Sequence, residues 1–404
     1  MNNLPLNLKK SIQERAAHYF NTIVDIRRHL HQHPELSFQE YNTIQYIKEH
    51  LTNEGFNFET PLETGITGLL KGDTINSKIV ALRADIDALP IEEKNNVQYA
   101  SQNKGVMHAC GHDAHTAALI GALMILKDLQ AEFNGDVKFI FQPGEEKLPG
   151  GAKNMIENGV LQNPEPDLII GQHVYPDLPV GKIGYRPGPY MASSDEIYIT
   201  LRGKGGHGAI PHKTDDTVYI ASQLIQSLQQ VVSRKAPPTI PTVLTIGKII
   251  GNGATNVIPD EVYMEGTFRT MDETWREEAH RLIRLIAESA AEPTHIKADV
   301  SVIKGYPVLI NNENMTHQCM EYSGQLVGKS NVETLDLRMT AEDFAYYTQK
   351  IPGVFYRLGV GNKSKGIDSA LHSSTFDIDE EALKTGMANL AWLAISFLNE
   401  HSTD

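Results

Sequence analysis

The sequence predicts an α/β fold in which a central, largely parallel sheet is flanked by helices and interrupted by an inserted βαββαβ unit. Three observations lead to this prediction. In residues 8–176 short apolar runs alternate with longer amphipathic runs, as strands and helices do around a parallel sheet. Residues 195–303 instead follow the order strand, helix, strand, strand, helix, strand, which is the ferredoxin-like split motif. After residue 304 the chain returns to helices and one short strand.

The first half of the chain supplies most of the expected sheet. Residues 8–32 have apolar side chains at helical spacing and are expected to form a helix, as are residues 115–129. Strands are expected over 78–87, 136–146 and 167–176, because these are short apolar runs bounded by polar or turn residues. Each of these strands ends in or near acidic residues or a histidine.

The middle of the chain is expected to form a compact unit of its own. Its predicted strands are 195–203, 242–249, 261–270 and 295–303, and its predicted helices are 217–233 and 273–291. Beyond it we expect a helix near 312–327, a strand at 354–360 and a last helix over 379–399. The chain therefore divides into a catalytic domain made of residues 1–187 and 305–404, and an inserted domain of residues 188–304.

Composition excludes several classes of protein. The 404 residues carry 36 basic and 50 acidic side chains, a net charge of −14, which argues against nucleic acid and anionic membranes as partners. No apolar run reaches the roughly 18 to 20 residues of a membrane helix, and the first 20 residues lack the apolar core of a secretory signal. Two cysteines, Cys110 and Cys319, do not make a disulfide framework. A reducing, cytoplasmic location is expected.

The octet HACGHDAH, residues 108–115, is the strongest local indication of function. It places a thiol and an imidazole two positions apart, at Cys110 and His112, and both are ligands that transition metals prefer. The alternative is a buried cysteine beside capping residues at the start of a helix. We expect His108 and His115 to support the site rather than to bind metal.

Further metal-binding side chains follow the predicted strands. Because ligands of open α/β sheets bind beyond the carboxyl ends of the strands, these residues should meet the octet at one edge. Each alone has an ordinary explanation, as a turn former, a solvated carboxylate or a common histidine. Their convergence favours a site for two metal ions. The residues concerned are Asp85, Asp87, Glu145, Glu146, His173 and, in the loop before the last helix, His372.

Such a site predicts hydrolysis of an amide. Two metals lower the pKa of a bound water and polarise a carbonyl oxygen. A carboxylate outside the metal shell can take the proton of the water and pass it to the leaving nitrogen. Of the adjacent pair we assign Glu145 as this base and Glu146 as a ligand.

Two loops of the inserted domain carry polar residues between glycines. RGKGGHGAIPH (202–212) contains His207, a candidate oxyanion donor, and GATNVIPD (253–260) contains Asn256, which could donate to a substrate carboxylate or oxyanion. The first loop is also explained as a plain connection between strand and helix. Together the two loops suggest a lid that closes over the metals.

At this point the sequence resembles a known family, that of the di-metal aminoacylases and amidohydrolases, which includes carboxypeptidase G and succinyl-diaminopimelate desuccinylase. It is most similar to the branch of hippurate hydrolases, auxin-conjugate hydrolases and bacterial N-acyl-amino-acid amidohydrolases. The resemblance runs almost end to end through ordered motifs. They include RRHLHQHPELSFQE (27–40), LRADIDALP (82–90), MHACGHDAHTAAL (107–119), FQPGEE (141–146), GGHGAIPH (205–212), TNVIPDEVYMEGTFRT (255–270) and LHSSTFDIDEEAL (371–383).

The resemblance implies a zinc-peptidase-like fold and a binuclear centre with manganese, zinc, cobalt or nickel. The implied metal ligands are Cys110, His112, Glu146, His173 and His372, with the thiolate of Cys110 as the bridge. Many relatives have a histidine–acid pair where this chain has Asp85 and Asp87, which implies that Asp85 is not a ligand and that Asp87 orients a ligating histidine. Lys147 and Pro149 replace a run of glycines common in relatives, so substrate preference does not carry over.

For the inserted domain, the resemblance implies a lid through which two chains form a homodimer. His207 would stabilise the oxyanion, often from the partner subunit, and Asn256 would contact the substrate. The implied substrates are N-acetyl, N-benzoyl or similar N-acyl amino acids, cleaved to a carboxylic acid and a free amino acid.

Other functions remain as alternatives. The nearest is a metallo-dipeptidase or carboxypeptidase that uses the same site. A non-catalytic relative that only binds a ligand would be expected to lack metal ligands, and none is missing here. A metal store or redox sensor built on Cys110 would not need the pair of glutamates or the lid loops.

Overall fold

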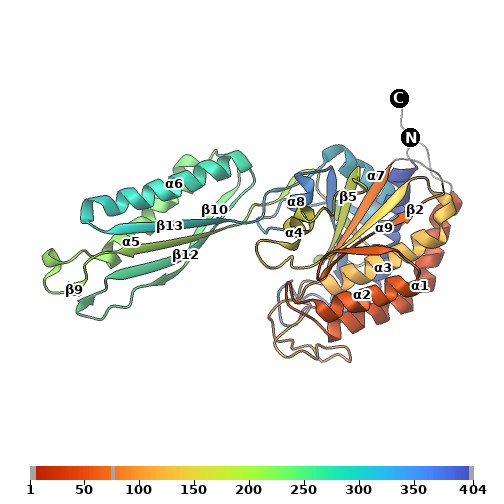
Figure 1. The fold of residues 1–404 in the computed structure, drawn as a ribbon, viewed down its shortest axis with the longest axis horizontal. Helices are drawn as coiled ribbons and strands as arrows, with labels where there is room; N and C mark the ends of the chain where they lie inside the picture. Colours follow the sequence, from red (N-terminus) through yellow and green to blue (C-terminus); the bar gives the residue numbers. More distant parts are fainter. Residues whose placement is uncertain (1–5, 74–77, 400–404) are drawn as a thin grey trace. The chain divides into compact units, whose positions relative to one another are not determined.

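The computed structural model describes residues 6–73 and 78–399 (Figure 1). These residues divide into two compact units. Unit 1 comprises 6–73, 78–188, 310–336 and 343–399, and unit 2 comprises 189–309 and 337–342. The short strands β7 (Gly188–Met191) and β14 (Leu309–Asn311) lie where the chain passes from one unit to the other. Each unit has its own apolar core.

Unit 1 is built on an eight-stranded mixed sheet whose four central strands are parallel. Its strand order is β1-β2-β4-β3-β5-β16-β6-β15, and β4, β3, β5 and β16 run in the same direction. Every residue of β3 and β16 is buried, as expected for strands covered on both faces. The strands are β1 (Phe58–Leu62), β2 (Gly65–Lys71), β3 (Ile79–Asp85), β4 (Asp136–Gln142), β5 (Leu168–Pro179), β6 (Ile183–Tyr185), β15 (Val332–Thr334) and β16 (Gly353–Gly361).

Helices cover this sheet. Helices α1, α3 and α9 pack against one another, and α3 and α9 also contact β3 (Figure 1). Helices α3 and α9 are buried along nearly their whole length, which explains why they are apolar on most sides rather than amphipathic. The helices are α1 (Leu6–Gln32), α2 (Tyr41–Asn53), α3 (His112–Asp128), α4 (Gly151–Glu157), α7 (Glu313–Val327), α8 (Ala345–Thr348) and α9 (Ala382–Leu398).

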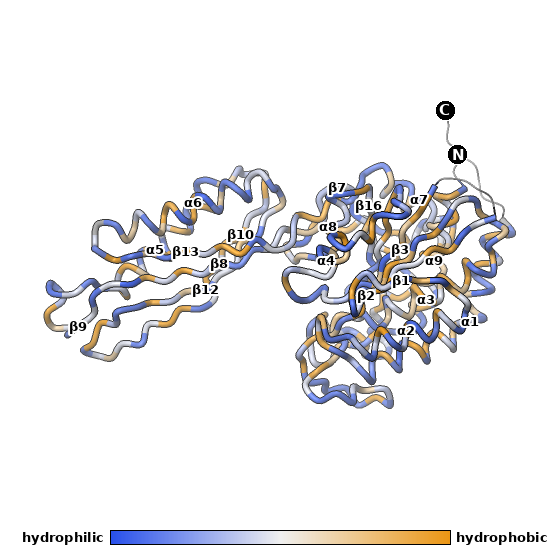
Figure 2. Tube along the Cα trace, viewed as in Figure 1, coloured by the Kyte–Doolittle hydropathy of each residue, from blue (hydrophilic) through white to orange (hydrophobic). Residues whose placement is uncertain are grey.

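Unit 2 is a four-stranded antiparallel sheet with two helices. The strand order β10-β12-β8-β13 and the sequence order strand, helix, strand, strand, helix, strand are those of the expected ferredoxin-like motif. Strand β8 alternates buried and half-buried residues, and α6 alternates hydrophilic and hydrophobic stretches (Figure 2). The elements are β8 (Asp195–Arg202), β9 (Gly206–His207), α5 (Thr217–Gln230), β10 (Thr242–Ile250), β11 (Val257–Ile258), β12 (Glu261–Thr270), α6 (Glu273–Ala291) and β13 (Lys297–Lys304).

The expected α/β class with a mostly parallel central sheet is confirmed, but the N-terminal elements α2, β1 and β2 were not predicted. Helix α2 lacks a capping side chain at its own N-cap. Its first N–H groups are instead accepted by Glu35, which lies outside the usual capping position. Strand β1 contains a proline and β2 two glycines, which weaken a strand pattern.

A membrane-crossing helix is not found: none of the helices within residues 6–73 and 78–399 combines the necessary length and apolar character.

Candidate metal centre

The carboxyl ends of the central strands bring the candidate residues of unit 1 together. Asp85 ends β3, Glu145 and Glu146 follow β4, and His173 lies in β5, which continues six residues further than this side chain. Cys110 and His112 reach the same place from the N-terminus of α3. The position agrees with the general rule for ligand sites of open α/β sheets.

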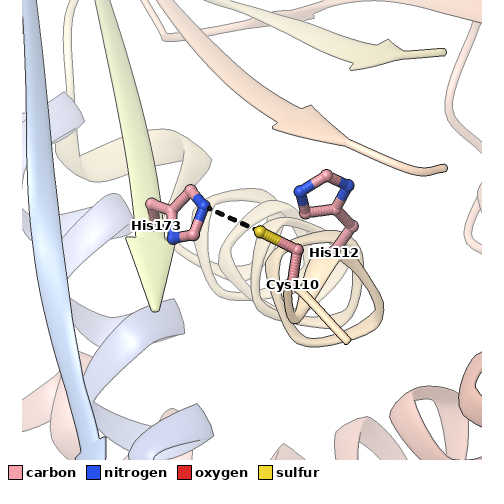
Figure 3. A group of neighbouring side chains, drawn as sticks. All are labelled: Cys110, His112 and His173. Atoms are coloured by element: carbon pink, nitrogen blue, oxygen red, sulfur yellow. Dashed lines mark hydrogen bonds between the residues drawn. The ribbon is translucent and has the colours of Figure 1, made fainter. Parts of the chain in front are cut away.

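Cys110, His112 and His173 form the first group of converging donors. The sulfur of Cys110 lies 3.4 Å from Nε2 of His173, and the two imidazoles flank it (Figure 3). Ligand atoms of all three residues lie within 4.8 Å of one another. Gly111 makes this turn with a φ of +81°, and a Cβ there would stand 2.5 Å from Cγ2 of Val174. The glycine is therefore required between the two donors of the octet.

Glu146 and His372 complete the cluster. Oε1 of Glu146 lies 3.1 Å from Nε2 of His372 and 4.0 Å from Nε2 of His112. Cys110, Glu146 and His372 again have ligand atoms within 4.8 Å of one another, as do His112, Glu145 and Glu146. His372 adopts a φ of +61°, and its N–H donates to Ala109 O in the octet segment over 2.8 Å. The overlapping groups make one site, which all five expected ligands and Glu145 share.

Hydrogen bonds fix which ring nitrogen of each histidine faces the site. Nδ1 of His112 lies 3.1 Å from Oδ1 of Asp87, and Nδ1–H of His173 donates to Val174 O over 2.7 Å. Both arrangements leave Nε2 directed at the other donors. Such outer contacts are typical of metal-binding histidines, since they select the tautomer and hold the ring.

His115 and Asp85 lie close to the site but are already engaged. Nδ1–H of His115 donates to Asp85 over 2.6 Å, and Nε2 of His115 accepts the N–H of Val174 over 2.8 Å. Asp85 also accepts from Nη1 of Arg83 over 2.7 Å. Although Asp85, His112 and His115 have ligand atoms within 4.8 Å of one another, His115 has no ring nitrogen left for a metal. The group of Asp85, His112 and His115 is therefore not a second ligand set.

The buried carboxylates of the cluster shift the pKa values of the Cys110 thiol and the His112 imidazole. Burial, and then the nearby carboxylates of Glu146 and Glu145, raise the pKa of the Cys110 thiol well above its usual range. Burial alone would lower the pKa of His112, but the Asp85 and Asp87 carboxylates outweigh it and raise that pKa to about 10. Both groups thus hold protons that a divalent cation would displace, as ligand binding to metals generally requires.

The donor set fits two divalent metal ions. Nε2 of His112 and Oε1 of Glu146 are buried and have no hydrogen-bond partner within residues 6–73 and 78–399. Buried polar groups are rarely left this way. One thiolate, three imidazoles and a carboxylate are ligands that suit zinc and tolerate manganese. The missing hydrogen bonds of these two atoms and the donor chemistry therefore agree with the metals that the sequence predicts.

His207 and Asn256 lie in unit 2, on neighbouring loops. His207 belongs to β9, which pairs with β11, and Gly208 N–H donates to Asn256 O over 2.8 Å. Nδ1 of His207 accepts the N–H of Ala209 over 3.0 Å, so a neutral ring carries its proton on Nε2. Both side chains are exposed, and Nε2–H can donate to a ligand.

Two buried networks beside the cluster were missed in the sequence analysis. Arg83 donates to Asp85 over 2.7 Å and to Asp343 over 2.8 Å. The backbone N–H of Asp343 in turn donates to Oε1 of Glu145 over 3.4 Å. Arg27 similarly joins Asp113, the neighbour of His112, to Asp377 in the loop that carries His372. A signal for both existed in the sequence: Arg83 interrupts an apolar strand, and Arg27 falls on the apolar face of α1.

His108 does not join the ligands. Its ring is buried, neither ring nitrogen has a hydrogen-bond partner in the described part of the chain, and burial lowers its pKa to about 4. The structure thus places this histidine of the octet outside every group of converging donors formed by the described residues.

The chain is similar to proteins of one known family. The sequence model described as peptidase family M20/M25/M40 matches residues 81–395. The N-acetyl-L-cysteine deacetylase of Bacillus subtilis is 42% identical over 364 residues, which cover 89% of this chain and 84% of that protein. Thermostable carboxypeptidase 2 of Saccharolobus solfataricus is 37% identical over 399 residues, covering 98% and 100%. The crystal structure of Bacillus subtilis YXEP, a dinuclear metal-binding peptidase of family M20, is 36% identical, with a TM-score of 0.80 and coverage of 95% and 99%.

Proposed function

The chain belongs to peptidase family M20/M25/M40, and we propose that this metal-dependent hydrolase cleaves the amide bond of N-acyl amino acids, releasing a carboxylic acid and a free amino acid. The observation that carries the proposal is the convergence of five donors next to the carboxylate of Glu145, with buried atoms of His112 and Glu146 that make no hydrogen bond among the described residues. The similarity to an N-acetyl-L-cysteine deacetylase over most of both chains supports an acylated amino acid as the substrate.

The proposed ligands are Cys110, His112, Glu146, His173 and His372. When bound, two divalent ions supply Lewis acidity for the scissile carbonyl and for the attacking water. We assign zinc, manganese, cobalt or nickel to the site on the strength of its mixed sulfur, nitrogen and oxygen donors. A reducing compartment such as the cytoplasm would keep Cys110 available as a ligand.

Glu145 is the proposed general base. Its carboxylate accepts a proton from the water as the water oxygen bonds to the carbonyl carbon, and it returns that proton to the nitrogen as the C–N bond breaks. Glu145 is buried and borders the donor cluster, where His112 and Glu146 lie within 4.8 Å of it. Asp87 holds the ring of His112 and takes no part in proton transfer.

His207 and Asn256 are the proposed lid residues. Nε2–H of His207 would donate to the oxyanion that forms at the carbonyl, and the amide of Asn256 would contact the substrate. The bond from Ala209 N–H to Nδ1 of His207 supports this role, because it directs the proton of the neutral ring to Nε2.

We also propose that two chains associate through unit 2. Strand β10 is an edge of its sheet and exposes Ile249 and Ile250, which are 52% and 38% accessible. Helix α5 of the same unit exposes Val218 and Tyr219. An open edge strand with apolar side chains is a template for pairing with another chain. A second copy of this chain would cover the apolar side chains and pair with the backbone groups of this edge.

A substrate screen tests the activity. The metal-free protein is loaded with each metal in turn and given N-acetyl, N-benzoyl and longer N-acyl amino acids, alongside dipeptides and peptides with a free carboxyl terminus. We expect hydrolysis of N-acyl amino acids and its loss on chelation. Because a thermostable carboxypeptidase is also similar over the full length, faster cleavage of the peptides would favour the dipeptidase or carboxypeptidase alternative. No turnover of either class with any metal would contradict both.

A further inference from the structure

Residues 37–40, which we call the bracing segment, contact the loop of the catalytic glutamates from far away in the sequence. They lie between α1 and α2, and Glu40 meets Gly144 across 104 positions. We infer that the bracing segment positions the general base, because it fixes the backbone on both sides of Glu145. The inference rests on the proposed role of Glu145 as the base.

Glu40 holds the residue before the base. Its Oε1 accepts the backbone N–H of Gly144 over 2.8 Å and the N–H of Phe38 over 2.9 Å. Glu40 is fully buried. Hydrogen bonds from backbone N–H groups to a buried carboxyl oxygen are strong and directional. The position of Gly144 therefore depends on a side chain that has no place in the metal shell.

Phe38 shapes the same point of the loop. A Cβ on Gly144 would stand 2.4 Å from Cε1 of the Phe38 ring, so this ring occupies the space beside the glycine. Phe38 itself has a φ of +65°, and Gly144 has a φ of +61°. A bulky residue in the left-handed region is strained and persists only where its surroundings hold it. The bond from Phe38 N–H to Glu40 is one such restraint.

Ser37 acts on the residue after the base, through Asp87. Oδ2 of Asp87 accepts the N–H of Glu146 over 3.0 Å and the hydroxyl of Ser37 over 2.6 Å. The backbone N–H groups before and after Glu145 thus end on two carboxylates, of which the bracing segment supplies one and holds the other.

The bracing segment acts on geometry and not on metal binding. None of its residues belongs to a group of converging donors within the described chain. A base works only within hydrogen-bond reach of the proton it takes, and a displacement of about 1 Å near a reacting group can cost about 100-fold in rate. Loss of the brace should therefore reduce turnover while the metals stay bound.

Glutamine is the conservative replacement at position 40. Oε2 of Glu40 is buried without a hydrogen-bond partner among the described residues, and burial together with the Asp87 carboxylate raises the pKa of Glu40 to about 7. A neutral amide keeps the acceptor that Gly144 and Phe38 use. Glu40→Gln should preserve the brace, and Glu40→Ala should remove it.

Glu35 provides a matched control. Its carboxylate also accepts two backbone N–H groups, those of Asn42 and Thr43, but these belong to the start of α2 and not to the catalytic loop. The first measurement is hydrogen–deuterium exchange of metal-loaded protein. Glu40→Ala should speed exchange at 144–146 at least about tenfold, Glu35→Ala should speed it only at 41–45, and Glu40→Gln should stay close to the wild type.

The second measurement is kinetic. Glu40→Ala should lower kcat about 10- to 100-fold, with an unchanged KM and two metals per chain, whereas Glu40→Gln and Glu35→Ala keep most of the rate. Ser37→Ala is the milder second variant if Glu40→Ala does not fold, and it should speed exchange at Glu146. Any of three results would overturn the inference. The first is unchanged exchange at 144–146 in both Glu40→Ala and Ser37→Ala. The others are loss of metal from Glu40→Ala and an equal loss of kcat in Glu35→Ala. A wild type without hydrolase activity would count against the proposed function, and the exchange data would still decide the brace.

Discussion

Adjacent residues in the site have different tasks because their side chains meet different neighbours. Glu145 and Glu146 are consecutive, yet Glu146 lies 3.1 Å from His372 and the Glu145 carboxylate accepts from Asp343 N–H. Cys110 and His112 meet only because Gly111 turns the chain between them. At this scale the decisive quantity is which atom of each side chain makes a hydrogen bond, and the buried atoms of His112 and Glu146 that make none among the described residues mark the proposed metal site.

Mutation should distinguish the roles of Glu145 and Glu146. Glu145→Gln should retain two metals and lose about 10²- to 10⁴-fold in kcat, since it removes only the proton acceptor. Glu146→Gln should lose metal affinity, because a neutral amide is a poor substitute for an anionic ligand. Metal content by elemental analysis and kcat at saturating metal check both. Near-normal turnover of Glu145→Gln would contradict its assignment as the base.

Glu40 should also make stability depend on pH. Its pKa is raised from 4.5 to about 7 by burial and then by Asp87, so the folded state binds more protons than the unfolded state between these values. The contribution of Glu40 to stability is therefore full below pH 4.5 and declines as the pH rises to about 7. Glu40→Gln, which does not titrate, should gain stability relative to the wild type across this window, by on the order of 3 kcal/mol at most. Urea unfolding at fixed pH values measures the difference, and a constant difference would refute the expectation.

Individual elements place the site through their ends. Strands β3 and β4 end at the same edge of the sheet, and β5 continues beyond it. Helix α3 begins there, with a glycine in the left-handed conformation at its N-cap. The start of α3 is three residues earlier than the apolar pattern predicts, so His112 and His115 belong to its first turns. The proposed ligands Cys110 and His112 thus lie on either side of a helix N-cap that has no side-chain cap.

Two glycines with similar backbone conformations test this helix start. Gly111 and Gly366 have φ values of +81° and +73°, but only at Gly111 would a Cβ collide, with Val174, and nothing lies within 4 Å at Gly366. Gly366→Ala should cost about 1 kcal/mol of stability from backbone strain alone. Gly111→Ala should cost about 1–3 kcal/mol more and should weaken metal binding. Denaturant unfolding and metal titration measure the two variants. Equal losses of stability and of metal affinity would show that the structure accommodates a Cβ at position 111 without further cost.

The edge strand β10 allows a test of self-association. Ile249→Lys places a charge on the exposed edge and should convert a dimer to a monomer, measured by light scattering after gel filtration. Leu285→Lys on α6, where the leucine is 47% exposed, is the control and should leave association unchanged. A dimer that persists in Ile249→Lys would exclude this edge as the interface.

At the scale of the whole molecule, the proposed metal site and the proposed lid residues belong to different units. All five proposed ligands and Glu145 belong to unit 1, whereas His207 and Asn256 belong to unit 2. Each unit buries its own apolar core. The stability of unit 1 should therefore be linked to metal, and that of unit 2 should not.

Metal removal tests this separation. A ligand present at 100 times its Kd stabilises the folded state by about 2.7 kcal/mol, so chelation should destabilise unit 1 by about that amount per site. Hydrogen exchange should become faster in β3, β4 and β5 and stay unchanged in β8 and β12. Equal acceleration in both sets of strands would mean that the units unfold together.

The α/β class, the mostly parallel central sheet and the type of chemistry were predictable from the sequence. Apolar periodicity reports burial over a few residues, and the octet with its thiol and imidazoles identifies metal-binding side chains without any fold. The motifs further supported the family, which the comparisons confirm. The partners of each donor were not predictable, because they come from segments that only the strand order brings together.

Only the tertiary structure decided which histidine turns a ring nitrogen toward the donor cluster and which uses both nitrogens elsewhere, as His173 and His115 illustrate. It also decided that Glu40 reaches Gly144 over 104 positions, and that Arg83 and Arg27 neutralise buried carboxylates next to the site. The physical reason is that hydrogen bonds act over about 3 Å, whereas sequence patterns record only local burial. Residue types were therefore readable from the chain alone, and their pairing required the fold.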